Sequence, residues 1–248
     1  MTDDTGHAGT RAALISLVEL SQVKEEAYRA ELDTSERAQT GTAEEWAPKE
    51  VVAHLAFWKD RQTQRIETMM RGEEPPDGRS WGELNTEMWP EHARLTWDES
   101  VARSDQATRD LIAALQRVPP DMLNNPDDPA SQANLLITTT LGNTLGHVAE
   151  HIANYYRDLG DTERATSAQE DAVRAIVDAR LGSSHEGSAR YNLACYYALH
   201  GQPADAITEL REALARRPDL VTWARQDHDL DSLRAAPEYQ ALVPAEEA

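Results

Sequence analysis

The sequence predicts an all-α protein, and three observations support this prediction. Apolar residues recur with the 3.6-residue period of helices along most of the chain, and the alternation typical of β-strands is absent. Prolines and glycines stand near the ends of the periodic segments, where helices begin and stop. Hydrophobic residues make up 40% and charged residues 27% of the 248 residues, a balance typical of a folded globular chain.

Residues 1–160 contain the helices expected of a bundle. Long helices are predicted over 11–32, 48–71, 96–116 and 129–158, and a shorter helix over 81–94 is expected to cross the bundle. Pro48 takes the first position of the second helix, where its missing N–H costs nothing, and Gly72 follows its end. Thr96 and Glu99 have the spacing of a capping box. Four long helices with one crossover predict a four-helix bundle.

Residues 161–248 have a different pattern. Helices are predicted over 162–181, 188–200 and 203–216, with a break at 182–184 and a last segment, 230–242, that is interrupted by Pro237. The pair of shorter helices resembles a tetratricopeptide repeat at Leu193, Ala194, Tyr197, Gly201, Ala206, Leu210, Ala213 and Pro218. A lone repeat cannot bury both of its faces. We therefore expect this module to pack on helix 162–181, on the bundle or on another subunit.

Charge and composition exclude several function classes. The formal net charge is −20, from 44 acidic and 24 basic residues, which disfavours binding to nucleic acids and to anionic membranes. Cys195 is the single cysteine, so no intramolecular disulfide can form, and we expect it to be a small core residue. Residues 1–10 lack the apolar stretch of a signal peptide, and no apolar run approaches the length of a membrane span. These observations together favour a cytoplasmic protein.

Three histidines form a candidate metal site. On a helical wheel, His151 lies about 40° from His147, so that both imidazoles point the same way and can bind one ion. Thr140, Thr144 and Asn154 lie on the same polar ladder beside an apolar stripe. His54 lies at the edge of the apolar stripe of the second helix and could supply a third nitrogen. The spacing alone is equally compatible with histidines that are only hydrogen-bonded in the interior.

Two stretches around these histidines resemble a known family. Residues 46–58 (WAPKEVVAHLAFW), residues 143–152 (NTLGHVAEHI) and Asn85 resemble the signatures of the DinB-like superfamily, and most of all its DfsB and colibactin self-resistance branch. The resemblance covers roughly residues 10–159. It implies a four-helix bundle, often dimeric, in which His54, His147 and His151 bind a divalent metal and leave a position open to substrate. Zinc or nickel suits three imidazoles. Ala47 departs from the pattern, because a Ser or Thr helix cap is usual there.

Further residues are candidates for the surroundings of the metal. Glu150 could orient a ligand or act as a general base, or it could be an exposed residue facing Arg157. Arg61 and Arg65 could bind an anionic substrate or the carboxylates of a low-molecular-weight thiol, or they could form a solvated basic strip. Trp58 is expected in the pocket wall or the core. Asn143 and Thr144 complete the candidate substrate pocket.

Residues 147–151 also match the inverted zinc-peptidase motif H-x-x-E-H. A peptidase is disfavoured, because those enzymes need a third, acidic ligand and a larger catalytic domain.

The sequence thus predicts a metal-dependent enzyme that acts on a small molecule. The resemblance implies either a thiol-dependent transferase or isomerase, or a hydrolase of detoxification or self-resistance. Two alternatives stay open: a protein that binds and sequesters a small molecule without turnover, and an adaptor that recruits a protein partner through the tetratricopeptide-like module. A homodimer is a further expectation from the resemblance.

Overall fold

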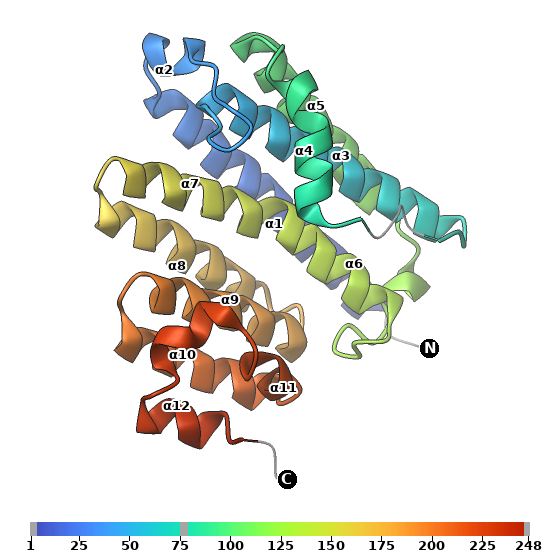
Figure 1. Ribbon diagram of the computed structural model, residues 1–248. Coiled ribbons are helices and arrows are strands. Elements are labelled where there is room, and N and C mark those ends of the chain that lie inside the picture. The colour runs from blue at the N-terminus through green and yellow to red at the C-terminus, as the bar shows by residue number, and fades with distance from the viewer. Residues whose placement is uncertain (1–3, 75–78, 246–248) are drawn as a thin grey trace.

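The computed structural model describes residues 4–74 and 79–245, and every regular element in them is a helix (Figure 1). This confirms the all-α prediction. The long bundle helices are α1 (Asp4–Glu31), α3 (Pro48–Met70), α5 (Trp97–Arg117) and a composite fourth helix of α6 (Gln132–Leu141), the π-helical segment η2 (Gly142–Gly146) and α7 (His147–Asp158). Shorter elements connect them: α2 (Thr34–Ala38), the crossing helix α4 (Trp81–His92) and the 3-10 turn η1 (Pro120–Leu123). None of the helices in the described residues is both long enough and apolar enough to cross a membrane.

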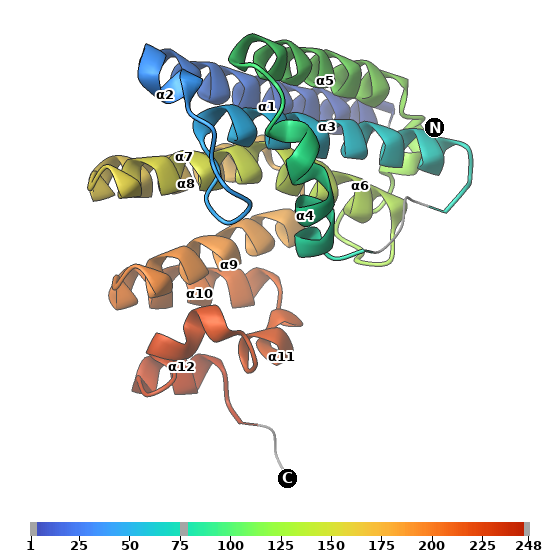
Figure 2. The same ribbon diagram turned by 45° about the horizontal axis from the view of Figure 1, so that its top comes forward.

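The C-terminal part continues with α8 (Thr162–Ala179), α9 (Ser183–Leu199), α10 (Pro203–Arg216), α11 (Leu220–Ala224), η3 (His228–Leu233) and α12 (Pro237–Leu242). Helix α8 runs beside α7, and α9 to α12 form further layers on the same side of the bundle (Figure 2). The module thus packs on α8 and on the bundle. Its kinship with tetratricopeptide repeats stays a prediction.

Helix α9 begins five residues earlier than the sequence predicts, because its cap comes from a distant loop. The Asp127 carboxylate accepts hydrogen bonds from the Ser184 N–H (2.8 Å) and the Ser183 hydroxyl (3.1 Å). Gly182, with a φ of 129°, brings the chain so close that a Cβ there would lie 2.7 Å from Asp127 Oδ1. Because Asp127, more than fifty residues away in sequence, supplies this acceptor, Ser183 and Ser184 belong to helix α9 and not to the predicted break.

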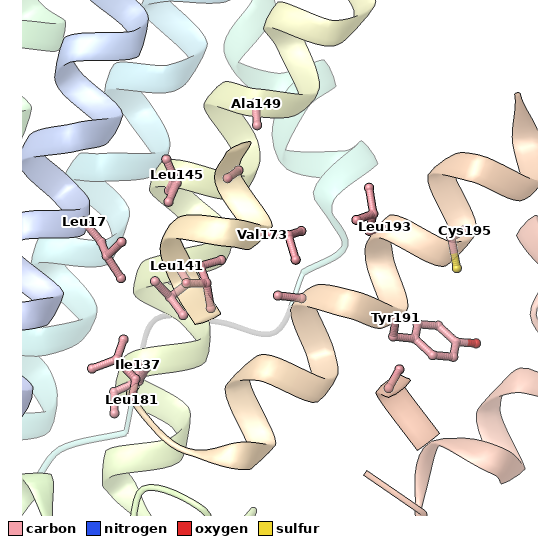
Figure 3. Close-up of a cluster of buried hydrophobic side chains, with 14 of the residues drawn as sticks. Leu17, Ile137, Leu141, Leu145, Ala149, Val173, Leu181, Tyr191, Leu193 and Cys195 are labelled. Atoms are coloured by element: carbon pink, nitrogen blue, oxygen red, sulfur yellow. The ribbon is translucent and has the colours of Figure 1, made fainter. Parts of the chain in front are cut away.

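The bundle and the C-terminal module share one hydrophobic core (Figure 3). It runs from Leu17 of α1 through Leu145 of the fourth helix and Val173 of α8 to Leu193 and Cys195 of α9. Cys195 is buried and free, which confirms its expected place in the core. Because no solvent layer divides this cluster, we expect the two parts to support each other's stability.

A buried charge pair links three bundle helices. The Lys59 ammonium of α3 lies 2.5 Å from a carboxylate oxygen of Glu25 in α1, and both side chains are at most 1% exposed. Ser104 of α5 donates to the other Glu25 oxygen over 2.6 Å and accepts from Lys59 over 2.9 Å. Arg29 lies 3.8 Å from the same carboxylate. All these charged atoms have partners, as buried charges require.

Leu193→Ala is expected to lower the free energy of unfolding by about 2–5 kcal/mol, because it leaves a cavity where the module meets α8. Leu199→Ala is the matched control. It removes the same atoms from the same helix at a position that is 59% exposed, and should change stability by no more than about 0.5 kcal/mol. Urea unfolding followed by circular dichroism measures both. Equal costs for the two variants would contradict the shared core.

Lys59→Met is expected to destabilise the protein by about 3–5 kcal/mol, because it leaves the Glu25 carboxylate buried without a counter-charge. The double variant Lys59→Met/Glu25→Leu removes both charges and should regain most of that loss. Chemical denaturation of the two variants measures the difference. A double variant as unstable as the single one would show that lost packing, rather than the unpaired charge, is the cause.

Candidate metal centre

Three imidazoles from two helices meet inside the bundle. Nε2 of His54, from α3, lies 2.9 Å from Nε2 of His147, the first residue of α7. Nε2 of His151, one turn further along α7, lies 3.1 Å from the same atom. Candidate ligand atoms of all three residues lie within 4.8 Å of one another. Two nitrogens that bind one ion at about 2.0–2.1 Å stand roughly 3–3.4 Å apart. The triad therefore could hold a metal ion, as the spacing predicts.

A π-helical turn, residues 142–146, immediately precedes His147. The Thr140 and Thr144 hydroxyls donate to the carbonyls of Leu136 and Thr140, four residues back in each case. At Gly146, a Cβ would lie 3.3 Å from the Leu141 carbonyl oxygen, which favours a residue without a side chain. A π turn holds one residue more than an α turn and is frequent at functional sites. A helical wheel with 100° per residue does not describe this turn. The signal for it in the sequence is the pair of glycines, Gly142 and Gly146, inside an apolar helix.

Burial keeps the three histidines neutral. Desolvation is the largest cause that lowers the pKa of His54 and His147, and repulsion from the other rings adds to it. Desolvation also lowers the pKa of His151, to about 4. At neutral pH each ring therefore keeps a nitrogen lone pair, which is the form that binds metals.

Three tryptophans surround the triad. The ring centroids of Trp46 and His54 are 4.4 Å apart, and Trp58 lies 6.1 Å from His54 and 6.2 Å from His147. Trp81, at the start of α4, lies 6.3 Å from His147 and is 58% exposed. Trp58 is buried, so it is at once a core residue and a wall of the site. The aromatic rings shield the imidazoles from water on this side.

A cleft of about 1050 Å³ opens beside the triad. It lies between residues 39–48, the C-terminal part of α1 and α7, and His151 is the triad member in its lining. Glu50 shapes the loop, because its carboxylate accepts from the N–H groups of Ala47 (2.8 Å) and Gly41 (3.1 Å). Glu50, three positions after the cap, thus makes one half of a capping box, while the half that a Ser or Thr side chain would make is missing at Ala47.

The cleft contains residues that the sequence analysis did not assign to a site. Asn154, Tyr155, Arg157 and Trp46 line it together with His151. Asn154 lies on the same polar face of the helix as His147 and His151, so the helical wheel already placed it near the site. Trp46 stands in an irregular loop, where periodicity carries no information.

The five expected pocket residues do not line this cleft. Trp58 belongs to the aromatic wall described above. Asn143 and Thr144 are buried inside the bundle and hydrogen-bonded there. Asn143 donates to Gln62 over 3.1 Å, Gln62 donates to Thr140 over 2.8 Å, and Thr144 donates to the Thr140 carbonyl.

Arg61 is buried and Arg65 half-buried. The pKa of Arg65 is lowered, mainly by burial and to a smaller extent by the charge of Arg61. Glu150 is exposed on α7, and surrounding protein atoms raise the pKa of its carboxyl while Arg157 lowers it. The charges that act on Glu150 are those of Arg157 and Asp229, and its catalytic role stays a prediction.

Comparison with known proteins adds one finding. The model of the DinB superfamily matches residues 9–159, which include all of the bundle except the first residues of α1, and all three histidines. No curated protein and no solved structure matches the chain. Metal binding is a property of the superfamily, and the His54, His147 and His151 cluster agrees with it. The match covers more than half of the chain, and we conclude that the protein belongs to the DinB superfamily.

Proposed function

We propose that this protein is an enzyme that binds one divalent metal ion through His54, His147 and His151 and acts on a small molecule held in the neighbouring cleft. The observation that carries the proposal is the meeting of three Nε2 atoms at 2.9 and 3.1 Å inside a buried, aromatic setting. Zinc or nickel suits this set of three neutral imidazoles.

The donor set fits a cation better than it fits hydrogen bonding. A neutral imidazole nitrogen carries either one proton or one lone pair. His147 Nε2 has two neighbouring nitrogens, His54 Nε2 and His151 Nε2, and can make one good hydrogen bond to only one of them. Three lone pairs directed at one ion remove this conflict.

Three protein ligands are typical of catalytic rather than structural sites, because they leave a position for substrate or water. When bound, the metal supplies Lewis acidity, which lowers the pKa of a nucleophile and polarises an electrophile. The chain's own residues do the rest. His151 connects the site to the cleft, while Trp46, Trp58 and Trp81 keep bulk water from the imidazoles.

Of the two reactions that the resemblance implies, the cleft favours hydrolysis. A low-molecular-weight thiol with carboxylates needs cationic partners, and Arg157, the one basic residue in the described lining, already donates to Asn154. Water has no such requirement. A sequestration protein is the second candidate, since a cleft of this size can bind a ligand without turnover.

Metal content tests the proposal. Protein purified without chelator, or reconstituted with Zn²⁺ or Ni²⁺, is expected to hold about one ion per chain by elemental analysis, and His147→Ala should lose it because one of three ligands is gone. His228→Ala is the control, because His228 is 91% exposed by side chain and far from the triad in sequence. Wild-type protein that stays free of metal after reconstitution would refute the metalloenzyme.

The same site should link metal to stability. At a free Zn²⁺ concentration of about one hundred times Kd, binding to the folded state alone raises the free energy of unfolding by about 2.7 kcal/mol. Thermal unfolding of the wild type should therefore shift upward with Zn²⁺, and the shift should be absent in His54→Ala. A similar shift in both proteins would place the bound zinc elsewhere.

A further inference from the structure

The cleft beside His151 is large enough for a whole small molecule. Its volume of about 1050 Å³ is at the upper end of the range for small-molecule sites. Residues 39–48 form one wall, and the C-terminal part of α7 from His151 onward, with Leu159 just after it, forms the other. A ligand in the cleft therefore reaches the histidine triad at one end and extends along α7 at the other.

Negative charge dominates this lining. The described lining contains one basic residue, Arg157, and four acidic residues: Glu36, Glu44, Glu45 and Asp158. Glu36 is engaged, since its carboxylate caps α2 and accepts from the Tyr155 hydroxyl over 3.1 Å. The carboxylates of the other three have no hydrogen-bond or ion-pair partner among residues 4–74 and 79–245. A concave surface concentrates such a field and raises the local concentration of cations.

Arg157 is the one positive charge set against these carboxylates in the described lining, and neutral partners hold its guanidinium in place. It donates to Asn154 Oδ1 over 2.5 Å, and its other terminal nitrogen donates to His200 Nε2 of the C-terminal module. His200 is itself held, because its Nδ1 lies 2.6 Å from the Tyr196 carbonyl and its ring stacks on Tyr196 at 4.3 Å. The guanidinium is therefore turned toward its own partners and is poorly placed to receive an anionic ligand.

Aromatic rings complete the lining. Tyr28 and Tyr155 form an edge-to-face pair with centroids 5.1 Å apart, and the half-buried Trp46 lies at the end near His54. Burial, together with the hydrogen bond to Glu36, raises the pKa of Tyr155 to about 12, so this ring stays neutral and electron-rich. Aromatic faces attract cations as well as apolar groups. Val51, Pro48 and Leu159 add apolar surface.

We propose that the cleft binds small organic cations, molecules that join an ammonium or guanidinium group to an apolar or aromatic body. Carboxylates and aromatic rings recognise the charge, and the remaining lining holds the body. The claim that these cations are substrates rests on the proposed metal site. The claim that they bind in the cleft does not. The cleft, and not Arg61 or Arg65, then decides which molecules reach the triad.

Three probes that differ only in their head group test this: phenylbutylamine, phenylbutanol and phenylbutyrate, titrated calorimetrically at neutral pH. The amine is protonated there. We expect it to bind at least about tenfold more tightly than the alcohol, with the acid weakest, and added salt should reduce the preference. Glu44→Gln/Glu45→Gln should reduce the amine's advantage about fivefold, because it removes two unpaired charges.

Asp178→Asn/Glu238→Gln is the matched control, since it changes net charge equally at exposed positions of α8 and α12 outside the cleft. The control should keep the amine's preference. Equal binding of amine and alcohol, failure of the amine to bind at millimolar concentration, or an unchanged preference in Glu44→Gln/Glu45→Gln would each overturn the proposal.

The titrations are repeated on His147→Ala, which separates the two proposals. An amine preference that survives in metal-free protein supports the cleft independently of the metal. Wild-type protein that binds metal but prefers the alcohol or the acid would refute the cation and leave the metal site standing.

Discussion

The buried pair of Lys59 and Glu25 sets the arrangement on which the candidate site depends. Charges this deep are stable only with fixed partners, so α1, α3 and α5 must keep the relative positions at which Glu25, Lys59 and Ser104 meet. Lys59 stands five residues after His54 on α3, so the contact that fixes Lys59 also limits where His54 can face α7. The Lys59 charge also acts on the triad. It helps to lower the pKa of His147, although desolvation and then repulsion from His151 are the larger causes. Fold and site therefore share one electrostatic constraint.

The two sides of the triad have opposite character, and this difference gives the site a direction. Trp58 and the bundle core desolvate the imidazoles, which keeps them neutral and able to bind a cation. Toward the cleft, carboxylates and tyrosines surround the open end at His151. A metal ion in the triad would thus be held by neutral donors, while the unpaired carboxylates of Glu44, Glu45 and Asp158 stay in the lining, available to the proposed ligand. This separation of roles is the main physical reason to regard the cleft as part of the same site.

Local signals predicted much of this structure. Pro48 and the Thr96 capping box mark helix starts that the structure has, and the i, i+4 spacing of His147 and His151 needed only a regular helix after residue 147. The missed features depend on contacts distant in sequence or on departures from regular geometry. The cap of α9 comes from Asp127, the π turn adds a residue that no wheel includes, and the cleft wall is a loop held by Glu50. Periodicity describes single helices, whereas a cleft is formed where two segments meet.

The C-terminal module bears on the site although it lies outside the family match. It shares the bundle's core through Val173 and Leu193, so its position against α7 is fixed by apolar burial rather than by a flexible linker. At the end of α9, His200 accepts from Arg157 and, together with Asn154, holds the guanidinium in place. Without that acceptor, Arg157 would keep only Asn154 as a partner and could turn toward the acidic residues of the cleft. In the proposed cation site, the module contributes by holding Arg157 in place, and this contribution needs no protein partner.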